Sequence, residues 1–246
     1  MNALCRRIAV SAGTAVLALG LPTGPGVAGA ETFDPVAAYG PEIVFDVFRK
    51  DERIGAHRVI FRRDNGDLIA ESRFAIKVTV LGLPVYTYEY TSTGRWRDGM
   101  LMRLEARTDD DGDVSTVGAE HHDGTLKVRG NGVRAVAPAG IYPTTHWNPG
   151  VIGARQVLNT ITGRINSVRM RNIGIEDVAT GTSRRAARHF AYEGELETEV
   201  WYDMKGRWVK MRFAGKDGAP IEYRCRICGG MPHDFETDAG AEQGML

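Results

Sequence analysis

Apolar residues alternate with polar ones along most of this chain, and a period of two is typical of strands with one buried face. Tyr86, Tyr88 and Tyr90, for example, share one face of a segment that runs toward Trp96. Turn signals recur about every 8–12 residues, as in an antiparallel meander. The pattern predicts strands in the first half of the chain at residues 43–48, 54–61, 68–80, 86–96, 100–108, 114–121, 126–129 and 133–137.

Short glycine-containing pairs mark the turns between these segments. Asn65-Gly66 and Asn131-Gly132 are strong hairpin signals, and Asp98-Gly99 and Asp123-Gly124 end strands in a similar way. Asparagine, aspartate and glycine suit such turns because they accept a positive φ. The pairs therefore predict hairpins between consecutive strands.

One interruption of the alternation predicts a helix. Asn148-Pro149 combines a good N-cap residue with proline at the first helical position. A short helix through Val151 and Ile152, reaching as far as Val157, is the only helix expected after the leader. Beyond Gly163 the alternation returns and predicts strands at residues 165–173, 187–193, 196–202, 208–213 and 221–225.

About a dozen strands and one short helix predict an all-β, mainly antiparallel fold. A sheet of that many strands coils, splits or closes, so we expect a strongly curved sheet or a half-open β-barrel with a concave face. A single β domain is expected over residues 31–228. Residues 229–246 contain glycine, acidic residues and methionine without periodicity, and this composition predicts a disordered tail.

The first thirty residues have the pattern of a cleaved signal peptide. Arg6 and Arg7 precede an apolar run at residues 8–21, and Ala28-Gly29-Ala30 supplies a small-x-small cleavage site. Cleavage after Ala30 predicts a periplasmic or secreted protein. Later apolar runs are shorter than the ~20 residues of a membrane helix, so no membrane span is expected.

Charge and motifs exclude several function classes. The chain has 31 basic and 31 acidic residues, a balance that gives no reason to expect a nucleic acid partner. The sequence lacks the G-x-S-x-G, H-E-x-x-H, phosphate-loop and dinucleotide motifs, so no cofactor is expected and an enzyme is less favoured than a binding protein. The acidic run at 109–113 has Val114 where a calcium loop requires glycine, and it predicts a hairpin loop rather than a metal site.

Two cysteines follow the leader, at Cys225 and Cys228. In an exported protein such a pair favours a disulfide, with two idle thiols as the alternative. Redox chemistry would need a thiol activated at a helix N-terminus, but a strand is predicted before Cys225. Zinc would need four ligands, and His233 brings the count only to three.

His146, Trp147 and Asn148 form the first candidate ligand-binding segment, at the start of the predicted helix. An imidazole, an indole and an amide at a helix N-terminus would suit an anion or a carbonyl oxygen. The alternative is a capped helix with a buried tryptophan.

Trp201, Tyr202 and Asp203 form the second candidate segment. Their rings offer a large contact area with a polar edge. The alternative is a hairpin in which Asp203 bonds its own turn and Trp201 packs across strands against Trp208.

Four motifs stand out from residue 147 onward: Trp147-Asn148-Pro149; Leu158-Asn159-Thr160 with Gly163; Trp201-Tyr202-Asp203-x-x-Gly206-x-Trp208-Val209; and Asp217-Gly218-x-x-Ile221-x-Tyr223. They resemble an exported bacterial family classified as a domain of unknown function, and the likeness covers roughly residues 43–223. The strand order is also similar to that of envelope lipoprotein carriers, half-open β-barrels around a helix that hold acyl chains. This resemblance implies a fold and an apolar concavity, but no reaction.

These observations favour a soluble exported protein that binds an apolar or amphipathic ligand, a lipid or an acyl chain, in a concave β face. One alternative is an envelope hydrolase that uses His146 with a carboxylate such as Asp203 or Glu222, which would require these side chains to converge. Another is a structural module with an exposed apolar patch for a partner. The oligomeric state is not implied by the sequence.

Overall fold

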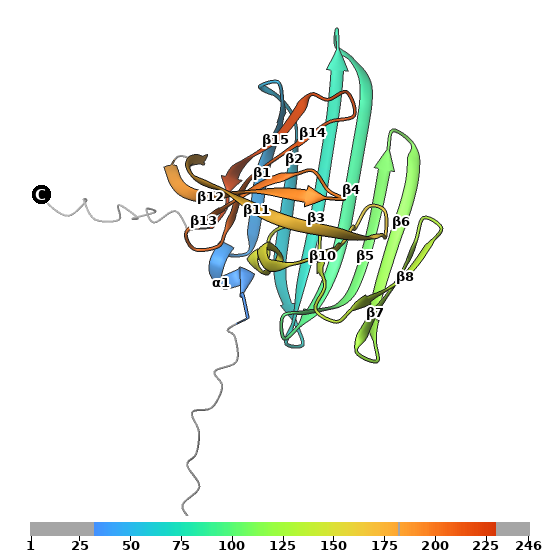
Figure 1. Ribbon diagram of the computed structural model, residues 1–246. Coiled ribbons are helices and arrows are strands. Elements are labelled where there is room, and N and C mark those ends of the chain that lie inside the picture. The colour runs from blue at the N-terminus through green and yellow to red at the C-terminus, as the bar shows by residue number, and fades with distance from the viewer. Residues whose placement is uncertain (1–31, 182, 230–246) are drawn as a thin grey trace, which may run out of the picture. The chain divides into compact units, whose positions relative to one another are not determined.

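The computed structural model describes residues 32–181 and 183–229 (Figure 1). The predicted signal peptide and residues 230–246 of the predicted tail lie outside this range. The elements are α1 (Pro35–Tyr39), β1 (Glu42–Arg49), β2 (Glu52–Asp64), β3 (Asp67–Val80), β4 (Leu83–Arg97), β5 (Met100–Asp110), β6 (Asp113–His122), β7 (Thr125–Gly130), β8 (Val133–Pro138), β9 (Tyr142–Pro143), the 3-10 helix η1 (Pro149–Gly153), β10 (Gln156–Leu158), β11 (Ile165–Thr180), β12 (Ser183–Gly194), β13 (Glu199–Asp203), β14 (Trp208–Ala214) and β15 (Pro220–Ile227).

All of these strands belong to one sheet, in the order β8-β7-β6-β5-β4-β3-β2-β1-β15-β14-β13-β12-β11-β10-β9. Strands β1–β8 form a first antiparallel meander and β11–β15 a second, and the pairing of β1 with β15 joins them. The β9–β10 and β11–β15 pairings are parallel. The predicted all-β, mainly antiparallel fold is confirmed.

The predicted hairpin turns are confirmed by their backbone conformation. Asn65-Gly66, Asp98-Gly99, Asp123-Gly124 and Asn131-Gly132 all have two consecutive residues with positive φ. Two positive φ values characterise the type I′ turn, whose twist matches that of the flanking strands. Local sequence therefore determines how consecutive strands pair.

The predicted helix after residue 148 is confirmed at its start and wrong at its end. Asn148 Oδ1 accepts a hydrogen bond from the Gly150 amide at 2.9 Å, as an N-cap does. The helix is a 3-10 helix that ends at Gly153, because Val157 pairs with Asn166 in the β10–β11 ladder. Similarly, β11 continues past the predicted end at residue 173, beyond a bulge between Asn172 and Gly174.

Helix α1 was not predicted. It has the same start signal as η1, because Asp34 Oδ1 accepts from the Val36 amide at 2.9 Å and Pro35 occupies the first turn. Tyr39, in its last turn, is buried, and its Oη donates to the Trp147 carbonyl at 2.8 Å and accepts from the Trp208 amide at 2.7 Å. The short helix thus joins distant segments of the chain.

The two meanders pack face to face. In Figure 1 the dark yellow strand β11 crosses in front of the long strands β3 and β4, and the ring of Tyr223 on β15 lies 5.4 Å from that of Phe74 on β3. Tyr90 Oη donates to Thr160 Oγ1 at 2.8 Å, and Asn131 Nδ2 donates to the Ile161 carbonyl at 2.7 Å. The segment between η1 and β11 therefore lies over the first meander.

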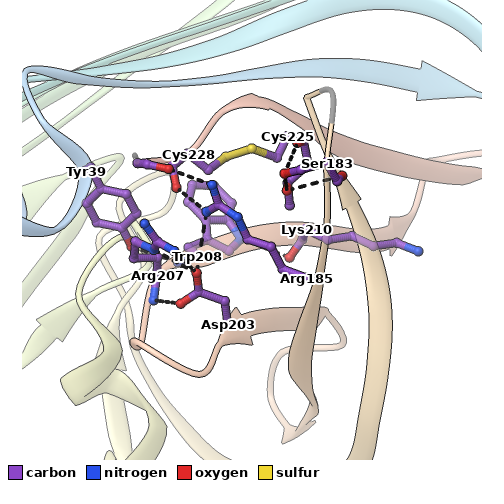
Figure 2. Close-up of a disulfide and its surroundings, with 11 residues drawn as sticks. Tyr39, Ser183, Arg185, Asp203, Arg207, Trp208, Lys210, Cys225 and Cys228 are labelled. Carbon is purple, nitrogen blue, oxygen red and sulfur yellow. Dashed lines mark hydrogen bonds and ion pairs between the residues drawn. A yellow bond between two sulfur atoms is a disulfide. The ribbon is translucent and has the colours of Figure 1, made fainter. Parts of the chain in front are cut away.

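Cys225 and Cys228 form a disulfide, as predicted (Figure 2). The guanidinium of Arg185 donates to the carbonyls of Cys228 at 3.1 Å and Gly229 at 2.7 Å. Gly229, the first residue of the predicted tail, is buried there. Arg185 belongs to β12, so these two hydrogen bonds tie the residues that follow β15 to β12.

Candidate ligand-binding cavity

A cavity of about 640 Å³ lies between the first meander and the β14–β15 hairpin. Its wall is mainly aromatic and aliphatic. The apolar side chains on it include Phe74, Ile76, Val78, Tyr88, Met211 and Tyr223.

Neighbouring strands provide one side of this wall. On β3 and β4, residues directly opposite each other point to the same face of the sheet. The cavity-lining pairs are Phe74 with Tyr90, Ile76 with Tyr88, and Val78 with Tyr86. The three tyrosines that the sequence placed on one strand face thus all line the cavity.

Charged side chains gather at the exposed end of the cavity. Arg49 forms an ion pair with Asp217, and Lys216 Nζ lies 2.7 Å from Asp110 Oδ2. Tyr86 Oη donates to Asp110 Oδ1 at 2.8 Å. The hydrogen bond from Lys216 lowers the pKa of Asp110 below its ordinary value, despite partial burial of the carboxyl. These contacts tie the β14–β15 turn to β1 and β5.

His57 lies at the buried end of the cavity, where it is 8% exposed. Its ring centroid is 5.5–5.9 Å from the rings of Tyr223, Trp208 and Phe74. Neither ring nitrogen has a hydrogen-bond partner among the described residues. Burial, assisted by nearby His146, lowers the pKa of His57 to about 3, so the imidazole is neutral at physiological pH.

His57 was not among the predicted site residues, although the sequence contains a signal for its burial. Val59 and Phe61 follow it at intervals of two on β2, and all three are buried. A histidine in phase with the apolar residues of a strand is expected to point into the core. Whether it meets a cavity there depends on distant strands.

His146, which the sequence selected, also lines the cavity. Its backbone has a positive φ of 58°, which turns the chain ahead of η1. Its Nδ1 lies 3.4 Å from Tyr192 Oη, and burial lowers its pKa to about 4. Its ring and that of His57 each lie 5.6 Å from the ring of Trp208. The cavity wall thus contains two neutral imidazoles, those of His57 and His146, and both pack against the indole ring of Trp208.

Trp147 and Asn148 have structural roles and are absent from the cavity wall. The Trp147 ring packs edge-to-face on Phe61 and Trp96, at centroid distances of 5.4 and 5.0 Å, and the residue is 2% exposed. Asn148 caps η1. This arrangement is the one given above as the alternative to a ligand-binding segment: a capped helix with a buried tryptophan.

Trp201 and Tyr202 point to opposite faces of β13, and neither lines the cavity. The Trp201 ring stacks on His189 at a centroid distance of 4.0 Å, and its Nε1 donates to Glu176 Oε2 at 3.0 Å. Tyr202 Oη donates to the His146 carbonyl at 2.8 Å. Tyr202 therefore supports the backbone of a cavity residue without reaching the cavity.

Asp203 belongs to a buried ionic cluster, shown in Figure 2. Its Oδ1 accepts from the amides of Lys205 and Arg207 at 2.9 and 3.0 Å, as the turn interpretation expected. Its Oδ2 lies 2.6 Å from Arg207 Nη2 and 3.5 Å from Arg185 Nη1. Of the six predicted ligand-binding residues, His146 alone lines the cavity.

The two carboxylates considered for a hydrolase form ion pairs with arginine and lysine side chains. Asp203 pairs with Arg207, and Glu222 pairs with Arg224 at 2.5 Å and Lys210 at 3.4 Å. Neither carboxylate lines the cavity with His146.

In residues 32–181 and 183–229, no group of three or more histidine, cysteine or acidic side chains is placed to hold a metal ion. No helix in these ranges is both long and apolar enough to cross a membrane.

A solved structure has a similar fold. It is described as the crystal structure of a β-barrel-like protein of the domain of unknown function DUF1849 from Brucella abortus. The two share 13% sequence identity, with a TM-score of 0.53 over 75% of this chain and 94% of that chain. At this identity the similarity concerns the fold, and it supports the predicted barrel-like architecture.

No curated protein matches this chain. Residues 45–226 match the model of a family described as a domain of unknown function, DUF6134, and the match spans nearly the whole sheet. The protein therefore belongs to the DUF6134 family.

Proposed function

We propose that this protein binds an apolar or amphipathic small molecule, such as a lipid or an acyl chain, in the cavity. The observation that carries this proposal is the open volume of about 640 Å³ behind a mainly apolar wall. Small-molecule sites usually occupy about 300–1,000 Å³ and have such walls. Transfer of apolar surface from water to this wall supplies the driving force, at about 25 cal/mol per Å².

The proposed place of action is the periplasm or the exterior of the cell. It rests on the signal-peptide pattern of residues 1–30. The disulfide between Cys225 and Cys228 agrees with an oxidising compartment.

Filling the cavity is expected to abolish ligand retention. Ile76 lines the cavity on β3, and Ile76→Trp would place an indole in the volume that a ligand needs. Mass spectrometry of organic extracts from protein purified from its native source should recover a bound molecule from the wild type and at least about tenfold less from this variant.

The matched control is Ile175→Trp, because Ile175 is 63% exposed on β11 and does not line the cavity. Its extract should match that of the wild type. Recovery of no bound molecule from the wild type, or of equal amounts from both variants when both are folded, would contradict the proposal.

A second candidate function is docking on a membrane surface through the β3–β4 turn. Leu81, Leu83 and Val85 are 98%, 68% and 54% exposed, and such clustered apolar side chains mark interaction sites. Val85 also lines the cavity, so the turn lies beside its exposed end. A lipid ligand could therefore pass between a bilayer and the cavity.

The double variant Leu81→Ser/Leu83→Ser is expected to lose membrane binding. Each leucine removed takes away apolar surface worth about 1.5–3 kcal/mol when buried. Co-sedimentation with vesicles of phosphatidylethanolamine and phosphatidylglycerol should therefore fall by more than about tenfold. Ile175→Ser, a change at an exposed residue elsewhere on the sheet, should have no effect. Equal sedimentation of wild type and double variant would exclude this role for the turn.

A further inference from the structure

Strand β11 is an edge of the sheet along most of its length. Its residues 168–180 pair with β12 on one side. On the other side, among the described residues, β10 covers only residues 165–167 and β15 meets only Thr180. Every residue from 171 to 177 is exposed. Residues 169–179 therefore form an unpaired edge, which we call the β11 edge.

The alternation of the backbone determines which residues of the β11 edge point outward. The Val168 amide donates to the Arg155 carbonyl, just before β10, at 2.9 Å, so Val168 directs its N–H away from β12. In an antiparallel pair, successive residues alternate between facing the paired strand and facing away from it. A bulge between Asn172 and Gly174 shifts this alternation by one position. The residues that present N–H and C=O groups to the open edge are then Met170, Asn172, Ile175, Asp177 and Ala179.

The bulge divides the β11 edge into two arms of opposite charge. The basic arm, before the bulge, carries Arg169 and Arg171. The acidic arm, after the bulge, carries Glu176 and Asp177. All four side chains are about half exposed or more. The edge therefore has the charge pattern of a strand that is complementary to its own reverse.

The charged groups at the ends of the two arms have capacity for a further contact. Within the described chain, only Nε of the five Arg171 N–H donors has a partner, Glu193 Oε1 at 2.6 Å. Each oxygen of Glu176 has one contact, with His189 Nδ1 at 2.7 Å or Trp201 Nε1 at 3.0 Å, and can accept a second hydrogen bond. Glu193 and His189 are four residues apart on β12, so Arg171 and Glu176 share one face of the sheet.

We propose that the β11 edge pairs with the β11 edge of a second copy of this protein, in an antiparallel, two-fold symmetric dimer. Antiparallel pairing brings the basic arm of each copy against the acidic arm of the other. One register matches both the outward-facing backbone groups and the side-chain faces. In it, Asn172 lies opposite Ile175 of the second copy, and Arg171 lies opposite Glu176 of the second copy. The two bulges then meet at the two-fold axis.

A second copy fits the β11 edge better than another strand does. Bulges and charges on an edge strand ordinarily prevent pairing with arbitrary strands. A second β11 matches both, because its bulge falls at the same place and its charges run in the reverse order. Pairing with β8, the opposite end of the sheet, would continue from copy to copy, and β8 ends in Pro138, which has no N–H to donate. The β11 edge does not line the cavity, so the dimer is independent of the proposed ligand.

Sedimentation velocity of the folded protein, with its disulfide intact, tests this inference. A strand pair buries less area than a permanent interface, so we expect a dimer with a Kd of about 10–100 µM at low salt. NaCl at about 0.5 M should weaken the dimer several-fold, because it screens exposed charges. A monomer at all protein concentrations up to about 500 µM would overturn the inference, and so would assembly that continues beyond the dimer.

Two charge reversals on the basic arm form a matched pair. Arg171→Glu sets two carboxylates against each other at both symmetric contacts, and it should weaken the dimer at least about tenfold. Arg169→Glu makes the same change opposite Val178 of the second copy, and it should weaken the dimer less than about threefold. Equal effects of the two changes would contradict the proposed pairing.

A substitution at Asp177 tests the backbone contacts. Asp177→Pro removes an outward N–H that β12 does not use, and proline is tolerated on edge strands. It should abolish the dimer, whereas Asp177→Asn keeps the N–H and should dimerise within about threefold of the wild type. A dimer retained by folded Asp177→Pro would show that the β11 edge is not the interface.

Amide hydrogen exchange of the wild type covers the case in which Asp177→Pro does not fold. The amides of Met170, Asn172, Ile175 and Asp177 should gain protection between about 5 and 500 µM protein, because they become hydrogen-bonded in the dimer. Exchange in β8 should stay the same. Protection gained in β8 or in the β3–β4 turn, with the β11 amides unchanged, would overturn the inference.

Discussion

Replacement of Asp203 by asparagine is expected to lower the free energy of unfolding by about 3–5 kcal/mol. The Asp203 side chain is 3% exposed and that of its partner Arg207 is 11% exposed. Asparagine has nearly the same shape and keeps an oxygen for the turn amides, so the change removes mainly the negative charge. Two guanidinium groups, of Arg207 and Arg185, would then share a buried site without a counterion. Removal of one partner from a buried ion pair is costly for this reason.

Urea unfolding followed by tryptophan fluorescence, with the disulfide intact, measures this effect. Asp177→Asn is the control, because Asp177 pairs with Arg184 where both side chains are about 60% exposed. Exposed pairs contribute about 0–1 kcal/mol. A loss at Asp203 no larger than the loss at Asp177 would show that the cluster in Figure 2 does not stabilise the fold.

The sequence predicted the features of the fold that depend on near neighbours. Strand alternation predicts which face of the sheet a side chain points to. A pair of adjacent turn residues predicts a hairpin, as at Asn65-Gly66 and Asn131-Gly132. Strand alternation also predicts that Tyr86, Tyr88 and Tyr90 share one face. The cap at Asn148 was predicted, whereas the equivalent cap at Asp34 was not, because only five helical residues follow it.

Pairings between distant strands could not be predicted in this way. The junction of the two meanders pairs β1 with β15, at opposite ends of the described chain, and alternation does not specify which edges meet. The length of β11 depends on a bulge that β12 accommodates. The cavity depends on how the two meanders pack, so its volume has no local sequence signal.

Residue type was an unreliable guide to the site for a related reason. Trp147 and Trp201 attracted attention as large aromatic rings, yet one packs in the core and the other stacks on His189. Asp203 forms ion pairs with Arg207, four residues later in the sequence, and with Arg185, which lies on β12. The two ring nitrogens of His57 have no hydrogen-bond partner among the described residues, and this becomes apparent only in the fold, where the neighbours of the ring are known.

Acidification from pH 7 to pH 5 is expected to lower the free energy of unfolding by about 4 kcal/mol through His57 and His146. Burial lowers the pKa of His57 to about 3 and that of His146 to about 4, from an ordinary value of 6.5. Below pH 6.5 both imidazoles therefore take up a proton in the unfolded chain and remain neutral in the folded chain. Each costs about 1.4 kcal/mol per pH unit in this range, so stability is full above pH 6.5 and falls as the pH approaches the folded values.

Comparison of variants isolates this effect from other titrations. Asp67, whose pKa is lowered to about 2 by its hydrogen bonds to Arg97 and Arg95, acts below about pH 4 and so outside the window. Urea unfolding of the delipidated protein at pH 7 and pH 5 should give a change about 2 kcal/mol smaller for His57→Phe than for the wild type. His122→Phe, at an exposed imidazole, controls for the loss of a histidine as such. The same change in stability for wild type and His57→Phe would mean that His57 binds a proton equally in both states, which a neutral imidazole enclosed by aromatic rings cannot do.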